Sequence, residues 1–241
     1  MTKARMHLVD EAIVLVGGLG TRLRAEVPNL PKPLAPVAGR PFLAYILDNL
    51  ARGGIRRVVL ATGYLAELIE GAVGATWQGM DIVYSREPSA LGTGGAVALA
   101  RQQLRGDAVH LCNGDTFLHY APAQLQACAQ RQGLELAVAL ARVEDVGRYG
   151  AVELAGERVT AFREKGGNAP GYINAGSYFL GRKVLEALPS DRAFSFEIEV
   201  LQPAAMAHGI AGCTQTADFI DIGVPEDYRR AQALFREPRC G

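Results

Sequence analysis

The first half of the chain alternates between short apolar runs and segments that have the apolar spacing of helices. The apolar runs, rich in Val, Ile and Leu, predict strands at 11–16, 55–62, 80–85 and 107–113. The segments between them predict helices at 42–54, 64–73 and 93–104. Strands that are apolar on both faces are typical of parallel sheets covered by helices on both sides. The alternation therefore predicts an α/β fold.

The second half is less regular and adds more strand-like segments. Strands are predicted at 134–140, 150–154, 158–165 and 172–180. The segment 218–237 predicts a strand, a proline turn and a closing helix. The chain contains no internal repeat and no long linker. We therefore predict a single Rossmann-like domain over residues 1–241, with a mixed, mostly parallel central sheet flanked by helices and a small β lobe from the second half.

Composition limits the classes of partner. The 241 residues are 49% hydrophobic, which suits a packed core. Lys and Arg number 25 together, as do Asp and Glu, so the formal net charge is zero. Such a chain presents no overall field to nucleic acid or to an anionic membrane, and an anion must be bound at a local site.

Cysteine and histidine spacing gives no indication of a metal or a disulfide framework. The 4 cysteines form no CxxC pair, and the 4 histidines lack the spacing of metal ligands. Residues 1–10 do not resemble a signal peptide, and no apolar run approaches the roughly 18 residues of a membrane span. We expect a cytoplasmic protein without nucleic-acid or membrane partners.

A glycine-rich segment follows the first predicted strand. The string "GGLGTRL" occupies 17–23, and "PKP" occupies 31–33. Glycines allow backbone N–H groups to turn toward an anion without a Cβ in the way. Arg22 can donate two hydrogen bonds to phosphate oxygens, while Lys32 supplies a compact charge between two prolines that restrict the backbone. Together these features predict a phosphate site.

Other interpretations of this segment are possible. A dinucleotide-binding fingerprint requires a glycine where this chain has Leu23, and a Walker A string does not occur here. For the four residues 17–20 alone, a plain strand-to-helix turn with solvated cations is an equal alternative. A carboxylate, Asp115, follows the fourth predicted strand in "LCNGDTF" (111–117), at the sheet edge where open α/β sheets bind ligands. Taken alone, Asn-Gly-Asp is more typical of a turn.

The extended string resembles the signature of the sugar-1-phosphate nucleotidyltransferases, with Val16 where the family usually has alanine. Further segments resemble the family's motifs in its own order: "EPSALGTGGAV" (87–97), "LCNGDTF", "GRYGAVEL" (147–154), "FREKG" (162–166), "YINAGSYFL" (172–180) and "FIDIGVPEDY" (219–228). In the last of these, Val224 replaces a threonine. The resemblance covers residues 12 to 228.

The resemblance implies a role for each matched residue. The nucleotide is expected to contact Leu15, Gly17, Gly18, Gly20, Thr21, Arg22, Glu87, Gly92, Thr93 and Gly114. The sugar and its phosphate are expected to contact Gly150, Glu164, Lys165, Asn174 and Gly176. Mg²⁺ is expected on Asp115 and Asp221, because one carboxylate alone holds this ion weakly. Arg22, Lys32 and Asp115 are the expected catalytic residues.

The implied reaction joins a nucleoside triphosphate to a sugar 1-phosphate and releases pyrophosphate. Residues 17–50 look most like the short D-glycero-alpha-D-manno-heptose 1-phosphate guanylyltransferases, which implies GTP, Mg²⁺ and a product, GDP-heptose, for bacterial surface polysaccharide such as capsule. Roughly 11–116 would bind the nucleotide and 117–241 the sugar. The alternatives are another sugar phosphate, mannose or glucose, with GTP, dTTP, UTP or CTP, or a silent regulatory subunit that binds nucleotide sugars. A homo-oligomer, most simply a dimer, is expected.

Overall fold

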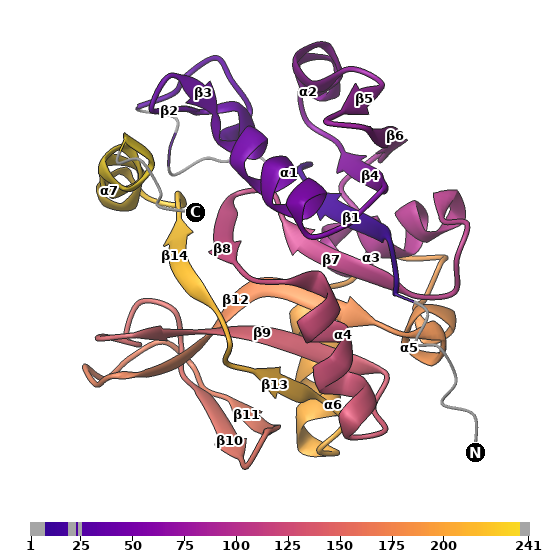
Figure 1. Cartoon of the computed structure of the whole chain (residues 1–241), viewed down its shortest axis with the longest axis vertical. Coiled ribbons are helices and arrows are strands. Elements are labelled where there is room, and N and C mark those ends of the chain that lie inside the picture. Colours follow the sequence, from indigo (N-terminus) through magenta and orange to yellow (C-terminus); the bar gives the residue numbers. More distant parts are fainter. Residues whose placement is uncertain (1–7, 19–22, 24–25, 237–241) are drawn as a thin grey trace.

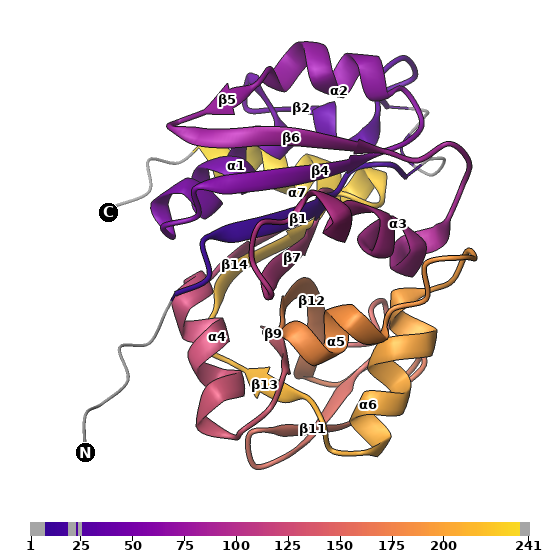
Figure 2. The same cartoon turned by 90° about the vertical axis from the view of Figure 1, so that its right-hand side faces the viewer.

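A computed structural model describes residues 8–18, 23 and 26–236, and its centre is a mixed sheet that runs through the whole molecule (Figures 1 and 2). The strands of this sheet are β1 (Glu11–Leu15), β4 (Arg57–Thr62), β5 (Thr76–Trp77), β6 (Met80–Arg86), β7 (Val109–Asn113), β9 (Leu136–Val143), β10 (Val152–Ala155), β11 (Arg158–Phe162), β12 (Gly171–Leu180) and β13 (Ala211–Cys213). Their order within the described residues is β10-β11-β13-β9-β12-β7-β1-β4-β6-β5.

Two short ladders and a set of helices complete the fold. The ladders pair β2 (Pro36–Val37) with β3 (Arg40–Pro41) and β8 (Thr116–His119) with β14 (Ala217–Asp221). The helices are α1 (Phe42–Arg52), α2 (Ala66–Val73), α3 (Gly92–Ala100), α4 (Pro122–Arg131), α5 (Arg182–Ala187), α6 (Gln202–Met206) and α7 (Pro225–Arg236). A π-helical turn, Glu197–Leu201, leads directly into α6.

The four strands predicted in the first half form the parallel part of the sheet. β7, β1, β4 and β6 are mutually parallel neighbours, so their carboxyl ends lie at one edge. Beyond them the sheet turns antiparallel, because β12 runs against both β7 and β9 and β5 runs against β6. The predicted mixed α/β sheet is confirmed. This central block forms most of its parallel part, and β13 and β9 form a further parallel pair.

Both faces of the parallel block are buried, which explains the absence of polar alternation in the sequence. In β1, Ala12 and Val14 face a core that includes Leu47 of α1, whereas Ile13 faces a second core that includes Val97 of α3. A third core lies between α4 and the strands β9, β12 and β13. In Figure 2 the helices can be followed on either side of the sheet.

The predicted strands of the second half are present as β9, β10, β11 and β12, and the closing strand and helix are β14 and α7. The helices α4, α5 and α6 were not predicted. The sequence of α4, "PAQLQACAQR", buries only half of its residues and carries three glutamines, so its apolar spacing is weak. Within the described residues, no helix is both long and apolar enough to cross a membrane.

Candidate active site

Three charged side chains from distant parts of the chain meet at the carboxyl edge of the parallel strands. Lys32 begins a 3₁₀ turn, Lys32–Leu34, after Pro31. Asp115 follows β7, and Asp221 is the last residue of β14. The ladder between β8 and β14 places Asp221 opposite Thr116, so the neighbouring Asp115 lies next to Asp221. Strand pairing across more than a hundred residues therefore brings the two carboxylates together.

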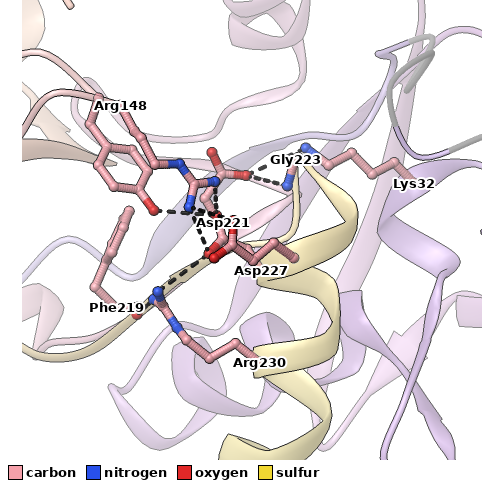
Figure 3. Close-up of polar contacts among 9 residues, drawn as sticks. Lys32, Arg148, Phe219, Asp221, Gly223, Asp227 and Arg230 are labelled. Carbon is pink, nitrogen blue, oxygen red and sulfur yellow. Dashed lines mark hydrogen bonds and ion pairs between the residues drawn. The ribbon is translucent and has the colours of Figure 1, made fainter. Parts of the chain in front are cut away.

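Lys32 lies between these carboxylates. Its Nζ is 2.6 Å from Asp115 Oδ2 and 3.5 Å from Asp221 Oδ1. The N–H of Gly223 donates a hydrogen bond to Asp221 Oδ1 at 2.7 Å, as Figure 3 shows. A Cβ at position 223 would lie 2.8 Å from the same oxygen, so the turn fits closely around the carboxylate only with glycine.

The two carboxylates fit a divalent cation. Both carboxylates already contact one cation, the Lys32 ammonium, and this shared contact is the observation by which we judge the fit. Burial raises the pKa of Asp221 above its ordinary value, Lys32 opposes this shift, and Asp115 adds to it. Mg²⁺ commonly uses one or two carboxylates together with substrate phosphates. Across the described residues no cluster of three or more His, Cys, Asp or Glu side chains has metal-binding geometry, so substrate oxygens would complete the coordination.

The charged cluster lines a pocket of about 380 Å³. Its walls are Leu15, Val16, Gly18, Lys32, Pro33, Thr93, Asn113, Asp115, Asp221 and Gly223. A second pocket of about 490 Å³ shares Leu15, Gly18 and Thr93 with the first and is also lined by Gly17, Ala61, Gly63, Tyr64, Glu87, Pro88, Ser89, Ala90, Gly92 and Ala96. The two pockets adjoin, and the second is mostly apolar. Most of the predicted nucleotide-binding residues that the structure describes are thus brought together.

Close packing fixes the walls of the second pocket. A Cβ on Gly17 would lie 2.9 Å from Glu87 Oε1. The other carboxylate oxygen of Glu87 accepts a hydrogen bond from the N–H of Leu91 at 2.9 Å, and burial raises the pKa of Glu87. Gly92 has a φ of +72°, and a Cβ there would lie 2.5 Å from the carbonyl oxygen of Phe194. The walls of this pocket therefore accommodate no larger side chain at Gly17 or Gly92 without a shift of the neighbouring groups.

Gly114 lies directly after β7, and its expected contact with the nucleotide stays a prediction. Its N–H donates to the carbonyl of Leu15 at 2.8 Å, and a Cβ would lie 2.7 Å from that oxygen. It holds the end of β7 against the end of β1 and does not line either pocket. Gly20, Thr21 and Arg22 lie outside the described residues, so their roles stay predictions.

Asn113 and Glu197 are among the residues in and around the site that sequence reasoning missed. Asn113, the last residue of β7, lines the first pocket, and its place in "LCNGDTF" was the available indication. Glu197 accepts a hydrogen bond from Thr93 Oγ1 at 2.6 Å, and Thr93 Oγ1 in turn accepts one from the N–H of Phe196 at 2.9 Å. The π-helical turn thus holds the start of α3, a contact that no local pattern predicts.

The predicted sugar-binding residues fall into two groups. Asn174 and Gly176 lie on a register irregularity of β12, next to the first pocket. Asn174 donates to the hydroxyl of Tyr178 at 2.9 Å and accepts from the N–H of Gly176 at 3.0 Å. Gly176 has a φ of +68°, and a Cβ there would lie 2.6 Å from Asn113 Nδ2.

Gly150, Glu164 and Lys165 form the second group, further from the charged cluster. Gly150 has a φ of +87°, and a Cβ would lie 2.4 Å from the carbonyl oxygen of Arg163, so the two loops are in contact. Glu164 and Lys165 are exposed in the loop after β11. Neither lines the two pockets described above, so the structure does not bring this group into contact with Lys32.

The fold and this site are those of a nucleotidyltransferase, and the comparisons agree. The sequence profile of the nucleotidyl transferase family matches residues 11–237, and the chain belongs to that family of enzymes. It is 41% identical over 225 residues to the D-glycero-alpha-D-manno-heptose 1-phosphate guanylyltransferase of Aneurinibacillus thermoaerophilus, which covers 92% of this chain and 96% of that protein. The predicted resemblance is confirmed.

Two further comparisons extend this finding. The chain is 40% identical over 233 residues to the mannose-1-phosphate guanylyltransferase of Mycobacterium tuberculosis, and the match covers 94% of this chain but 64% of that longer protein. The crystal structure of HddC from Yersinia pseudotuberculosis complexed with GMP-PN superimposes with a TM-score of 0.81 at 31% identity, covering 94% of this chain and 100% of HddC.

Proposed function

We propose that this protein transfers a guanylyl group from GTP to D-glycero-alpha-D-manno-heptose 1-phosphate, giving GDP-heptose and pyrophosphate for a bacterial surface polysaccharide such as capsule. The observation that carries the proposal is the position of Lys32 Nζ, 2.6 Å from Asp115 and 3.5 Å from Asp221, beside a mostly apolar pocket. The choice of GTP and heptose is supported by the relative that is 41% identical.

The chemistry requires charge neutralisation more than proton transfer. An oxygen of the sugar phosphate attacks the α-phosphorus of GTP, and the bond from that phosphorus to pyrophosphate breaks. The sugar phosphate is already ionised at neutral pH, so a general base is not needed. Positioning and electrostatic stabilisation are the main contributions of such a site. We assign Lys32 to the α-phosphate and Arg22 to the β- and γ-phosphates.

Asp115 and Asp221 would hold Mg²⁺. When bound, this ion would neutralise phosphate charge and orient the triphosphate. In this proposal, roughly residues 11–116 bind the nucleotide and residues 117–241 bind the sugar. The pocket lined by Gly17, Glu87 and Gly92 suits the flat, apolar faces of a base.

Pyrophosphate release tests the proposal. Purified protein is incubated with MgCl₂ and each of GTP, ATP, UTP, CTP and dTTP, in combination with the 1-phosphates of heptose, mannose and glucose. We expect GTP with the heptose phosphate to give the highest kcat/KM, and Asp115→Asn to reduce it at least about a hundredfold. Preference for mannose 1-phosphate would refute the heptose assignment. GTP binding without turnover in any combination would favour a regulatory subunit.

A further inference from the structure

Asp227 is a buried carboxylate outside the two pockets. Its side chain is 2% exposed, although it lies in the first turn of α7, a position where aspartates are usually solvated. Arg148 donates to Asp227 Oδ2 at 2.7 Å and to Oδ1 at 3.4 Å, and Arg230 Nη1 is 3.3 Å from Oδ1 (Figure 3). Because a buried carboxylate is costly without partners, these two arginines stabilise Asp227 in its buried position.

The two arginines differ in what they join. Arg230 lies one turn further along α7, so its contact stays within the helix. Arg148 lies in the loop between β9 and β10, 79 residues from Asp227 in the sequence. Tyr149 of the same loop also donates to Asp227 Oδ2, at 3.3 Å. The Arg148–Asp227 pair therefore connects α7 to the loop between β9 and β10.

Further contacts of α7 fix it to the first half. The hydroxyl of Tyr228 and Nε2 of Gln232 donate to the carbonyl of Pro36 at 2.6 and 2.8 Å. The ring of Phe235 lies 3.9 Å, centroid to centroid, from that of Tyr45 on α1. Since α7 begins directly after the turn that carries Asp221 and Gly223, these contacts also fix the position of Asp221.

The loop that carries Arg148 also carries one predicted sugar-binding residue. Gly150 is two residues further along, and its backbone packs against the carbonyl of Arg163. Two backbone hydrogen bonds join the loop to the segment with Glu164 and Lys165, from Gly166 N to Gly147 O at 3.1 Å and from Arg163 N to Ala151 O at 2.8 Å. Both loops are therefore held to α7 through Arg148, with Tyr149 as a second contact.

We propose that Arg148 and Asp227 form a positioning pair, which sets the distance between Asp221 and the loops of Gly150, Glu164 and Lys165. This inference rests on the proposed function, because it assigns the sugar phosphate to those loops. Without the pair, the loops lose their charged contact with α7 and keep the contacts of Tyr149 with Asp227 and with the ring of Phe219 on β14, while the pocket between β1 and α3 keeps its walls. Loss of the pair should therefore weaken the use of the sugar phosphate and leave GTP binding unchanged.

The test compares Arg148→Gln, Arg148→Lys, Asp227→Asn and the Arg148→Gln/Asp227→Asn double variant. KM for the sugar phosphate is measured by pyrophosphate release, Kd for GTP by calorimetry, and folding by the melting temperature. We expect KM to rise at least about tenfold in Arg148→Gln with the Kd for GTP within about twofold. Arg148→Lys should recover part of the loss, and the double variant should be no worse than the worse single variant.

Glu153→Gln is the matched control. It removes another ion pair of the second half of the chain, in which Arg163 donates two hydrogen bonds to Glu153 at 2.8 and 2.9 Å. This pair is exposed and does not contact α7. Its KM should stay within about twofold of the wild type. Should Asp227→Asn fail to fold, the Arg148 variants decide, because that side chain is partly exposed.

The outcomes separate this inference from the proposed function. If the wild type is active and Arg148→Gln has an unchanged KM for the sugar phosphate, the pair is only structural and the inference is overturned. The same conclusion follows if the binding of both substrates weakens equally. Wild-type protein without turnover in any substrate combination would overturn the proposed function itself, and the positioning role with it.

Discussion

Replacing Lys32 with methionine removes one charge from the site and keeps most of the side-chain stem. The lysine is 12% exposed, and the Asp115 and Asp221 side chains that it contacts are 38% and 34% exposed. Without the ammonium, the two carboxylates face each other across the pocket. The variant is therefore expected to lose stability, and added Mg²⁺ is expected to restore it, because a divalent cation supplies the missing positive charge.

The distances give the size of the effect. At an effective dielectric constant of about 20, opposite unit charges separated by 3.5 Å, the longer of the two contacts, attract by about 5 kcal/mol. Because both carboxylates keep about a third of their surface in water, screening and desolvation reduce the net contribution to about 1–2 kcal/mol. For a chain of this length that corresponds to a fall in melting temperature of about 2–8 °C.

Thermal unfolding with and without MgCl₂ measures this directly, with no need for a substrate. We expect Lys32→Met to melt below the wild type in EDTA and to gain more from Mg²⁺ than the wild type gains. Pyrophosphate release should fall about a hundredfold, since a cation at the reacting phosphates is lost. Lys183→Met, at an exposed position of α5, is the control and should melt like the wild type. Equal responses of Lys32→Met and the wild type to Mg²⁺ would refute the reasoning.

Three further predictions concern titration and backbone strain. Burial raises the pKa of Asp221 above its ordinary value of 3.8, so the Mg²⁺-dependent gain in melting temperature should fall as pH drops through that raised pKa, and Asp221→Asn should abolish this dependence. Burial lowers the pKa of His110 from 6.5 to about 4, so free energy of unfolding that is present above pH 6.5 is lost as the pH falls toward 4. At about pH 4.5 the loss in the wild type is about 2.5 kcal/mol. Urea unfolding at that pH should show this loss in the wild type and not in His110→Phe. Gly92→Ala should lower the melting temperature more than Gly79→Ala, because both glycines have a positive φ but only at 92 would the Cβ collide with backbone; equal losses would contradict this.

The first half of the fold was predictable because its physical basis is local. A strand such as β1 buries both faces, so its sequence is continuously apolar, and the helix that follows supplies the cover. The helix α4 was missed for the opposite reason. It contributes Leu125, Cys128 and Ala129 to a core, but three of its ten residues are glutamines, so its place depends on β9 and β12 and not on its own spacing.

The residues of the charged cluster could be predicted from the sequence, but their geometry could not. The motifs indicated Asp115 and Asp221, whereas their contact through Lys32 follows from the pairing of β8 with β14. No local pattern specifies that pairing. The burial of Asp227 could not be predicted for the same reason. In the sequence Asp227 lies at the charged start of a helix, and its burial depends on Arg148 from a distant loop.

The charges of the described cluster can be compared with the zero net charge of the whole chain. A chain with equal numbers of acidic and basic residues must attract polyanionic substrates locally. Yet Lys32 is matched by two carboxylates, so one positive and two negative charges leave the described cluster with a net charge of −1. Such a cluster repels a triphosphate until a divalent cation reverses its sign. In the proposed function, the two aspartates would serve a polyanionic substrate as ligands of a divalent cation, and Lys32 would hold them together before that cation binds.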